Sequence, residues 1–202
     1  MVDICCLCGY TVSSQLLGVD NMSKREGSNN VFHSRDMVYV AVMAAVLAVL
    51  AQFSIPMPTG TLLTLQTFAV ALCGSVLGIK KGLAAVGVYL LLGAVGLPVF
   101  ASFRGGLGIL AGVTGGFLIG FLPMAAFCGW GRDKKMLPSF IAGLIGLIIC
   151  HLIGVLWGSK VSATPLWPAF LMFSAPYLLK DAISVWLAML LARRIVKQLN
   201  ID

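Results

Sequence analysis

The order of apolar and polar stretches along the chain predicts a bundle of membrane-spanning helices. Long apolar runs alternate with short segments rich in glycine, proline or charged residues. A helix that crosses the hydrocarbon core needs about 20 mostly apolar residues. Six runs approach that length, and proline or charged clusters end most of them. The predicted spans are Met37–Phe53, Leu62–Leu77, Leu83–Phe100, Leu107–Phe127, Leu137–Trp157 and Tyr177–Ile195.

The segments outside the spans complete the predicted organisation. Residues 1–33 are weakly patterned and predict a flexible N-terminal extension, which precedes a six-helix membrane domain of residues 34–202. The first connection, Ile55–Thr61, contains two prolines and predicts a loop that can close over a ligand. A short helix is expected at Phe170–Ser174, in the connection before the last span.

Composition supports the membrane interpretation. Hydrophobic residues make up 59% of the chain and charged residues 10%, and the mean hydropathy is +1.00. Soluble domains carry about 25% charged residues. Because so few charged residues cannot cover a water-exposed surface, the chain is predicted to be an all-α integral membrane protein.

The basic residues are distributed unevenly between the two predicted sides of the membrane. One side holds both termini, the 2–3 loop and the 4–5 loop. It carries all of the 14 lysines and arginines except Arg104, Lys160 and Lys180. Since lysine and arginine accumulate on the cytoplasmic side, both termini are predicted to be cytoplasmic. The net charge of +7 then reflects topology and contact with anionic lipid of the bilayer, and not binding of nucleic acid.

Three charged residues at apolar helix ends mark a candidate site on the other side. Arg104, Lys180 and Asp181 lie in or beside apolar segments and not in long polar loops. A charged side chain at membrane depth is costly and indicates a functional site by default. The alternative is that Arg104 and Lys180 extend to lipid headgroups while Asp181 pairs with one of them.

Catalytic and metal chemistry find little support in the sequence. It contains no phosphate-binding loop, no G-x-S-x-G motif and no paired carboxylates. His33 and His151 are too far apart for a metal site with obvious spacing, and His151 is interpreted as a packing residue that bonds across helices. No second ligand group completes the cluster of Cys5, Cys6 and Cys8. We predict no catalytic residue, metal or cofactor, and a role in binding and transport.

Small residues in the first span form two pairs at a spacing of four, Ala41/Ala45 and Ala44/Ala48. Such pairs give a flat helix face that another helix can approach closely. The pattern alone fits a contact with a partner protein and internal packing equally well.

Three segments together resemble the BioY family, the biotin-binding S components of energy-coupling factor (ECF) transporters. The resemblance extends from about Arg35 to Ala192. It is carried by TLQTFAVALCG (64–74), VYLLLGAVGLPVFASFRGGLGILAGVTGGFLIGF (88–121) and APYLLKDAISVWLAMLLA (175–192).

The resemblance implies a six-helix S-component bundle in the bacterial inner membrane, with biotin captured near the outer face for uptake. It also implies that the chain is not an enzyme. A transmembrane T component and two ATPases supply the energy, although some members work without a dedicated module. The family's A-x-x-x-A surface for the T component matches Ala41 and Ala45 and favours that interpretation of the pair.

The family's site motifs match this chain in part. Arg104 corresponds to the family's arginine, and Asp181 to the aspartate of its G-D-x-x-K motif. Ser184 replaces the lysine of that motif, and Lys180 replaces its glycine. The family's G-P-T-G-G-Y corresponds to residues 112–117, which keep the threonine and all three glycines but have Val113 in place of the proline and Phe117 in place of the tyrosine.

The chemistry of biotin suits these residues. Its valerate carboxylate requires a cation, and its ureido ring offers two N–H donors and one carbonyl acceptor. We expect Asp181 to accept the ureido N–H bonds, and Arg104 or Lys180 to contact the carboxylate or the ureido carbonyl. The predicted binding residues are Arg104, Asp181, Lys180, Ser184, Gln66, Thr67, Tyr89, Gly106, Thr114 and Gly115.

Three other functions remain open at the level of sequence. A relative of these importers could carry another small carboxylate vitamin. An intramembrane enzyme, such as an acyl transferase, would convert its bound compound, whereas a transporter returns it unchanged. A purely structural membrane partner would bind no ligand through Arg104 or Asp181.

Overall fold

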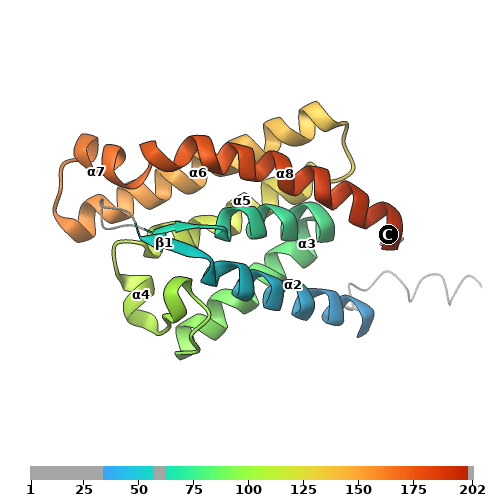
Figure 1. Cartoon of the computed structure of the whole chain (residues 1–202), viewed down its shortest axis with the longest axis horizontal. Helices are drawn as coiled ribbons and strands as arrows, with labels where there is room; N and C mark the ends of the chain where they lie inside the picture. Colours follow the sequence, from blue (N-terminus) through green and yellow to red (C-terminus); the bar gives the residue numbers. More distant parts are fainter. Residues whose placement is uncertain (1–33, 57–61, 200–202) are drawn as a thin grey trace, which may run out of the picture. The chain divides into compact units, whose positions relative to one another are not determined.

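The computed structural model describes residues 34–56 and 62–199, which form helices and one short β-hairpin (Figure 1). Strands β1 (Ser54–Pro56) and β2 (Leu62–Thr64) are antiparallel. The predicted extension of residues 1–33, with its three cysteines, and residues 57–61 of the predicted closing loop lie outside the described residues. The helices are α2 (Ser34–Gln52), α3 (Gln66–Val95), a 3-10 turn η1 (Ala101–Phe103), α4 (Leu107–Ala111), α5 (Gly115–Trp130), α6 (Met136–Ser162), α7 (Leu166–Phe173) and α8 (Ala175–Leu199).

The two alanine pairs of the first span lie on different faces of helix α2. Ala41 and Ala45 are exposed, whereas Ala44 is buried. A spacing of three or four residues places side chains on one face of a helix. The buried face consists of Val40, Ala44, Leu47 and Ala51.

Helix α3 reverses direction at Gly78. This residue has φ 78° and ψ −177°, which is not helical, and a positive φ is accessible to glycine at little cost. The two arms, residues 66–77 and 79–95, fold back on each other. Gln66 Nε2 donates to Tyr89 Oη at 2.6 Å, although 23 residues separate the two. The predicted second and third spans therefore become one helical hairpin.

The ends of the predicted second and third spans differ from the structure. Residues 62–64, predicted as helix, form strand β2 because they pair with β1. The predicted third span continues to Phe100, but the helix ends at Val95. Gly96 has φ 109°, and its left-handed conformation closes the last turn.

The predicted single span Leu107–Phe127 is wrong. It consists of α4 and α5, because Gly112 has an extended backbone (φ −74°, ψ −179°) and interrupts the helix. The predicted fifth and sixth spans are confirmed as α6 and α8, each longer than expected. The short helix expected at Phe170–Ser174 is α7, which begins four residues earlier.

Among the residues that the structure describes, four helices are long and apolar enough to cross a bilayer: α2, α3, α6 and α8. Helix α5 is also apolar but has only 16 residues. Large apolar side chains such as Val95 and Leu179 are exposed to 84% and 75%. Since lipid tails, unlike water, favour such side chains, the chain is a multi-pass membrane protein.

Several basic residues meet at the end of the bundle that contains the Gly78 turn. Lys81 forms an ion pair of 2.6 Å with Asp36 at the start of α2. Arg193 donates to the Lys134 carbonyl oxygen at 2.6 Å and so links α8 to the α5–α6 connection. Helix α5 packs between α3 and α6, and α3 packs against α8. This packing leaves a pocket near the opposite end, where Gln66 begins α3.

Candidate functional site

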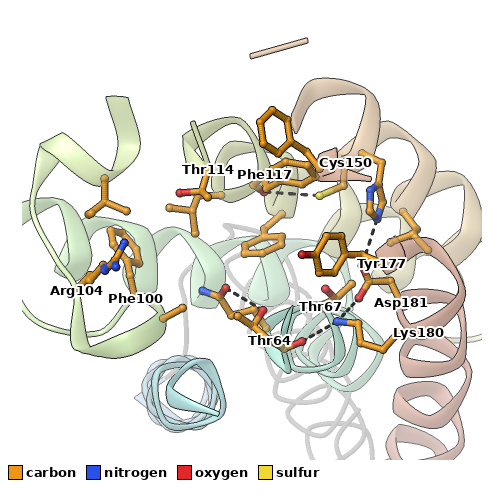
Figure 2. Close-up of a pocket in the computed structure, with 18 residues that line it drawn as sticks. Thr64, Thr67, Phe100, Arg104, Thr114, Phe117, Cys150, Tyr177, Lys180 and Asp181 are labelled. Atoms are coloured by element: carbon orange, nitrogen blue, oxygen red, sulfur yellow. Dashed lines mark hydrogen bonds and ion pairs between the residues drawn. The ribbon is translucent and has the colours of Figure 1, made fainter. Parts of the chain in front are cut away.

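A pocket opens among the helices around the start of α3 and α8 (Figure 2). Its cavity volume is about 140 Å³. One water molecule needs roughly 10–15 Å³ of such space, so the pocket has room for an organic ligand. It is lined by Thr64, Gln66, Thr67, Phe100, Ala101, Arg104, Ile109, Thr114, Phe117, Leu118, Phe121, Leu147, Cys150, His151, Phe173, Tyr177, Lys180 and Asp181.

Six of the predicted binding residues line this pocket, and four do not. Tyr89 lies behind the wall, where its hydroxyl accepts a bond from Gln66. Ser184 is buried one turn further along α8. Gly106 and Gly115 shape the backbone: the Gly106 N–H donates to the Gly93 carbonyl oxygen at 2.6 Å. The six in the lining are Arg104, Lys180, Asp181, Gln66, Thr67 and Thr114.

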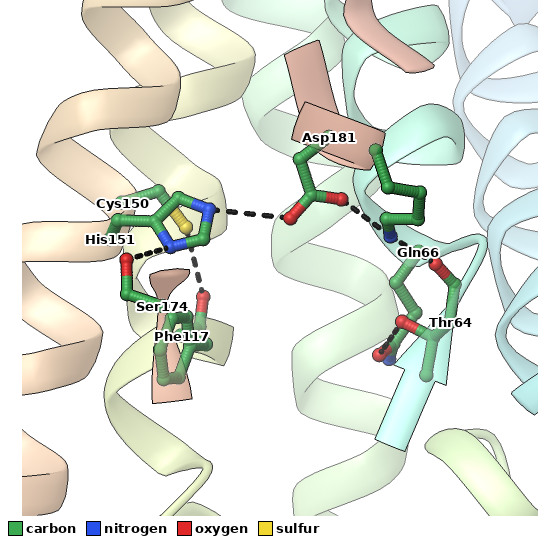
Figure 3. A network of polar contacts seen from close by, with 8 residues as sticks. Thr64, Gln66, Phe117, Cys150, His151, Ser174 and Asp181 are labelled. Carbon is green, nitrogen blue, oxygen red and sulfur yellow. Dashed lines mark hydrogen bonds and ion pairs between the residues drawn. The ribbon is translucent and has the colours of Figure 1, made fainter. Parts of the chain in front are cut away.

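The buried end of the pocket is built around Asp181, which is only 4% exposed. Its Oδ1 lies 2.5 Å from Lys180 Nζ, and its Oδ2 lies 3.3 Å from His151 Nε2 (Figure 3). Lys180 Nζ also donates to the Thr64 carbonyl oxygen at 2.7 Å. A buried carboxylate is costly unless it is paired, and here an ammonium and an imidazole surround it.

Asp181 still has acceptor capacity for a ligand. Apart from the ion pair with Lys180, its Oδ1 accepts no hydrogen bond from the residues that the structure describes. Each carboxylate oxygen can accept two. Within the lining, therefore, Asp181 can receive N–H donors, while the Lys180 ammonium can donate to a carbonyl or carboxylate.

His151 belongs to this network, which the sequence interpretation missed. It lines the pocket from α6, and its Nδ1 lies 2.8 Å from the Oγ of the fully buried Ser174. The Phe117 ring meets it edge-on, 5.7 Å between centroids. With its proton on Nε2, the imidazole donates to Asp181 and accepts from Ser174. It does bond across helices, as predicted, but it also forms the pocket wall.

Arg104 lies on the other side of the pocket from Lys180 and Asp181 (Figure 2). Its side chain is exposed, and it forms no ion pair with any acidic residue in the described ranges. The backbone of Phe100 and Arg104 pairs in both directions, at 2.9 and 3.3 Å. The Phe100 ring packs edge-on against Tyr89, so Arg104 is attached to a fixed part of the wall.

Gln52 holds the loop that carries Arg104. Its Nε2 donates to the Val99 carbonyl oxygen at 3.2 Å, and its Oε1 accepts the Phe103 N–H at 2.9 Å. The Ser54 and Ser102 hydroxyls meet at 3.0 Å. Ser102 and Phe103 have φ of 60° and 56°, a conformation that costs energy for residues with a side chain. These polar contacts keep the strained loop in place.

The middle of the pocket is apolar. Phe117 and Phe121 from α5, Leu147 from α6 and Phe173 from α7 face it. Within residues 34–56 and 62–199, no group of three histidine, cysteine or acidic side chains could hold a metal ion. The geometry suits an elongated organic molecule with an anionic group near Arg104 and N–H donors near Asp181.

The chain matches the family model described as "BioY family" over residues 22–201. A "Probable biotin transporter BioY" of Pyrococcus horikoshii is 37% identical over 166 residues, covering 80% of this chain and 96% of that protein. A "Biotin transporter BioY" of Rhodobacter capsulatus is 37% identical over 179 residues, covering 81% and 94%.

A solved structure has a similar fold. It is described as a crystal structure of the S-component for biotin from an ECF-type ABC transporter. The TM-score is 0.73 at 27% sequence identity, and the match covers 81% of this chain and 91% of that chain.

Proposed function

Because the chain belongs to the BioY family, we propose that it binds biotin and takes part in its uptake. The observation that carries the proposal is the pocket with the Asp181–Lys180–His151 network at its buried end and Arg104 at its exposed side. Relatives that cover most of this chain are named biotin transporters. As a member of a transporter family, the protein is not an enzyme.

The proposed ligand orientation follows from burial. The ureido ring enters first and donates its N–H groups to Asp181, while Lys180 donates to the ureido carbonyl. The bicyclic ring and the valerate chain contact the phenylalanines in the middle of the pocket. The carboxylate remains near Arg104, where a charge-assisted bond is about twice as strong as a neutral one.

Lys180 replaces the missing lysine of the G-D-x-x-K motif in this proposal. Lys180 and Ser184 are four residues apart on α8, so they lie on the same face, one turn from each other. A lysine moved by one turn still brings an ammonium to Asp181, as the 2.5 Å contact illustrates. The altered motif is therefore compatible with biotin.

Equilibrium binding of labelled biotin to the detergent-purified protein tests the proposal. We expect tight binding that Arg104→Ala weakens by about 1.5–3 kcal/mol, the value of a hydrogen bond to a charged group. Biotin amide should bind wild-type protein more weakly than biotin, and the difference should largely vanish in Arg104→Ala. Arg194→Ala, an exposed arginine near the other end of α8, is the control.

Failure to bind biotin by folded wild-type protein would contradict the proposal. Desthiobiotin, lipoate and other carboxylate vitamins should then be tested as competitors or direct ligands, since a different vitamin is the nearest rival. Recovery of a chemically altered ligand would favour an intramembrane enzyme instead.

Gln52 is not part of the pocket lining, but removing its amide should weaken biotin binding indirectly. In Gln52→Ala the loop loses its bonds to Val99 and Phe103, so Arg104 is less well positioned. We expect a loss of about 0.5–1.5 kcal/mol, the net value of one hydrogen bond. Biotin amide, which lacks the charged group, should be affected less. Gln198→Ala on the exposed end of α8 is the control, and equal losses for both ligands would contradict this role.

We also propose the membrane arrangement and partners expected of an S component. The chain crosses the bacterial inner membrane six times, with α3 contributing two crossings, and both termini are cytoplasmic. The gathering of basic residues near the Gly78 turn supports this orientation. Residues 1–33 precede the membrane domain as an extension. The exposed pair Ala41 and Ala45 contacts a T component that works with two ATPases.

A further inference from the structure

A second cavity, which has His151 in common with the lining of the biotin pocket, lies between α6, α7 and α8. Its volume is about 470 Å³. We name it the α6–α7 groove. Two buried polar residues line it, His151 and Ser174, and they are bonded to each other. The apolar lining includes Leu152, Leu156, Leu166, Trp167, Phe170 and Leu178.

We propose that the α6–α7 groove binds one anionic diacyl phospholipid, with an acyl chain in the groove and the phosphate at Lys160. The rim of the groove faces outward: Leu152 is 57% exposed, Leu156 50% and Trp167 70%. In a multi-pass membrane protein, such side chains on membrane-spanning helices meet acyl chains. The proposal does not depend on the identity of the transported vitamin.

Lys160 supplies the charge that selects the headgroup. Ile148, Leu152, Leu156 and Lys160 follow one another at intervals of four residues, so they form one stripe along α6. Lys160 is exposed and ends this stripe, one turn beyond the groove. No acidic side chain in the described part of the chain forms an ion pair with it. An ammonium in this position attracts anionic lipid.

The groove is held open by a fixed turn between α6 and α7. Ala163 has φ 52°, and Ser159 Oγ donates to the Thr164 carbonyl oxygen at 2.6 Å. Trp167 and Phe170 stack at 6.0 Å between ring centroids and form one wall. Tryptophan is also frequent at the level of lipid headgroups. The groove therefore exists before a lipid enters it.

The length of the groove favours an acyl chain over a partner helix. Helix α7 has eight residues and is about 12 Å long. The bonded pair of His151 and Ser174 closes the floor. A helix of another protein, or of a second copy, needs a longer and flatter surface for ridge-and-groove packing.

Native mass spectrometry of the delipidated full chain tests this site. Phosphatidylglycerol and phosphatidylcholine with identical acyl chains are added separately, and inorganic phosphate is the third arm. We expect one tightly held phosphatidylglycerol per chain, weaker phosphatidylcholine binding and no competition by millimolar phosphate. Lys160→Gln should reduce phosphatidylglycerol binding roughly fivefold and leave phosphatidylcholine unchanged. Lys135→Gln, an exposed lysine at the other end of α6, is the matched control.

Filling the groove tests the acyl-chain contact independently. Leu152→Trp should reduce binding of both lipids, whereas Leu187→Trp on an exposed face of α8 outside the groove should not. Thermal unfolding verifies that each variant is folded. Equal binding of the two lipids by wild-type protein would overturn the proposal, and so would full phosphatidylglycerol binding by Lys160→Gln. A dimer that Leu152→Trp dissociates would instead identify a second copy as the occupant.

Discussion

Replacing Asp181 with asparagine is expected to weaken biotin binding by about 2–5 kcal/mol, the cost of truncating one partner of a buried charge pair. Asparagine has the same size, but it is neutral and presents an NH₂ group where Lys180 and His151 require an acceptor. The two ureido N–H donors of biotin also lose an anionic acceptor. Equilibrium binding of labelled biotin measures the loss.

Two further variants make this result specific. Asp133→Asn changes an acid whose side chain is 93% exposed, and it should bind biotin normally. Asp181→Glu retains the charge and should keep more affinity than Asp181→Asn. If Asp181→Asn is folded and binds biotin with wild-type affinity, the carboxylate does not contact the ligand, and the proposed orientation is incorrect.

Gly115→Ala is expected to lower the free energy of unfolding by about 1–3 kcal/mol, the usual cost of overpacking. The reason is steric: a Cβ at Gly115 would overlap the carbonyl oxygen of Leu110. Because this oxygen belongs to the backbone, relief requires α4 and α5 to move apart. Thermal or denaturant unfolding in detergent measures the effect.

Gly108→Ala is the matched control, because a Cβ at Gly108 meets no atom within 4 Å. Alanine has the higher helix propensity, so this change in α4 should be neutral or slightly stabilising. A destabilisation of Gly115→Ala no greater than that of Gly108→Ala would contradict the packing role. Gly115 was predicted to bind the ligand; in the structure it begins α5 next to the backbone of α4 and is not part of the pocket lining.

The hydrophobic pattern predicted helices better than it predicted where the backbone turns. Helices α2, α6 and α8 begin within a few residues of their predicted positions, since long apolar runs identify them. The turn at Gly78 lies in the predicted loop between the second and third spans, which Lys80 and Lys81 mark, whereas the break at Gly112 was not predicted. Apolar residues continue on both sides of Gly112, so the hydropathy pattern does not indicate a break there. Several glycines lie close together in this segment, and composition alone does not identify the one with a non-helical backbone.

The charged residues that line the site were predicted, as were three of its neutral polar residues, Gln66, Thr67 and Thr114, whereas the roles of His151 and Gln52 were not. Asp181 and Lys180 stood out because ionisable groups are rare in apolar segments. His151 has the same property, but one histidine in a long apolar helix does not reveal its partner on α8. Gln52 acts through backbone groups of a loop almost 50 residues away. Such contacts depend on tertiary structure, and the sequence holds no pattern for them.

The reversal at Gly78 bears on how the protein is made. The first arm of α3, residues 66–77, is about 18 Å long, well short of the roughly 30 Å hydrocarbon core. The second arm begins at once, and Lys80 and Lys81 occupy its first turn. During biosynthesis, we expect the translocon to release both arms into lipid together, with the two lysines retaining the turn on the side proposed to be cytoplasmic. Membrane insertion of this region then waits until translation has passed residue 95.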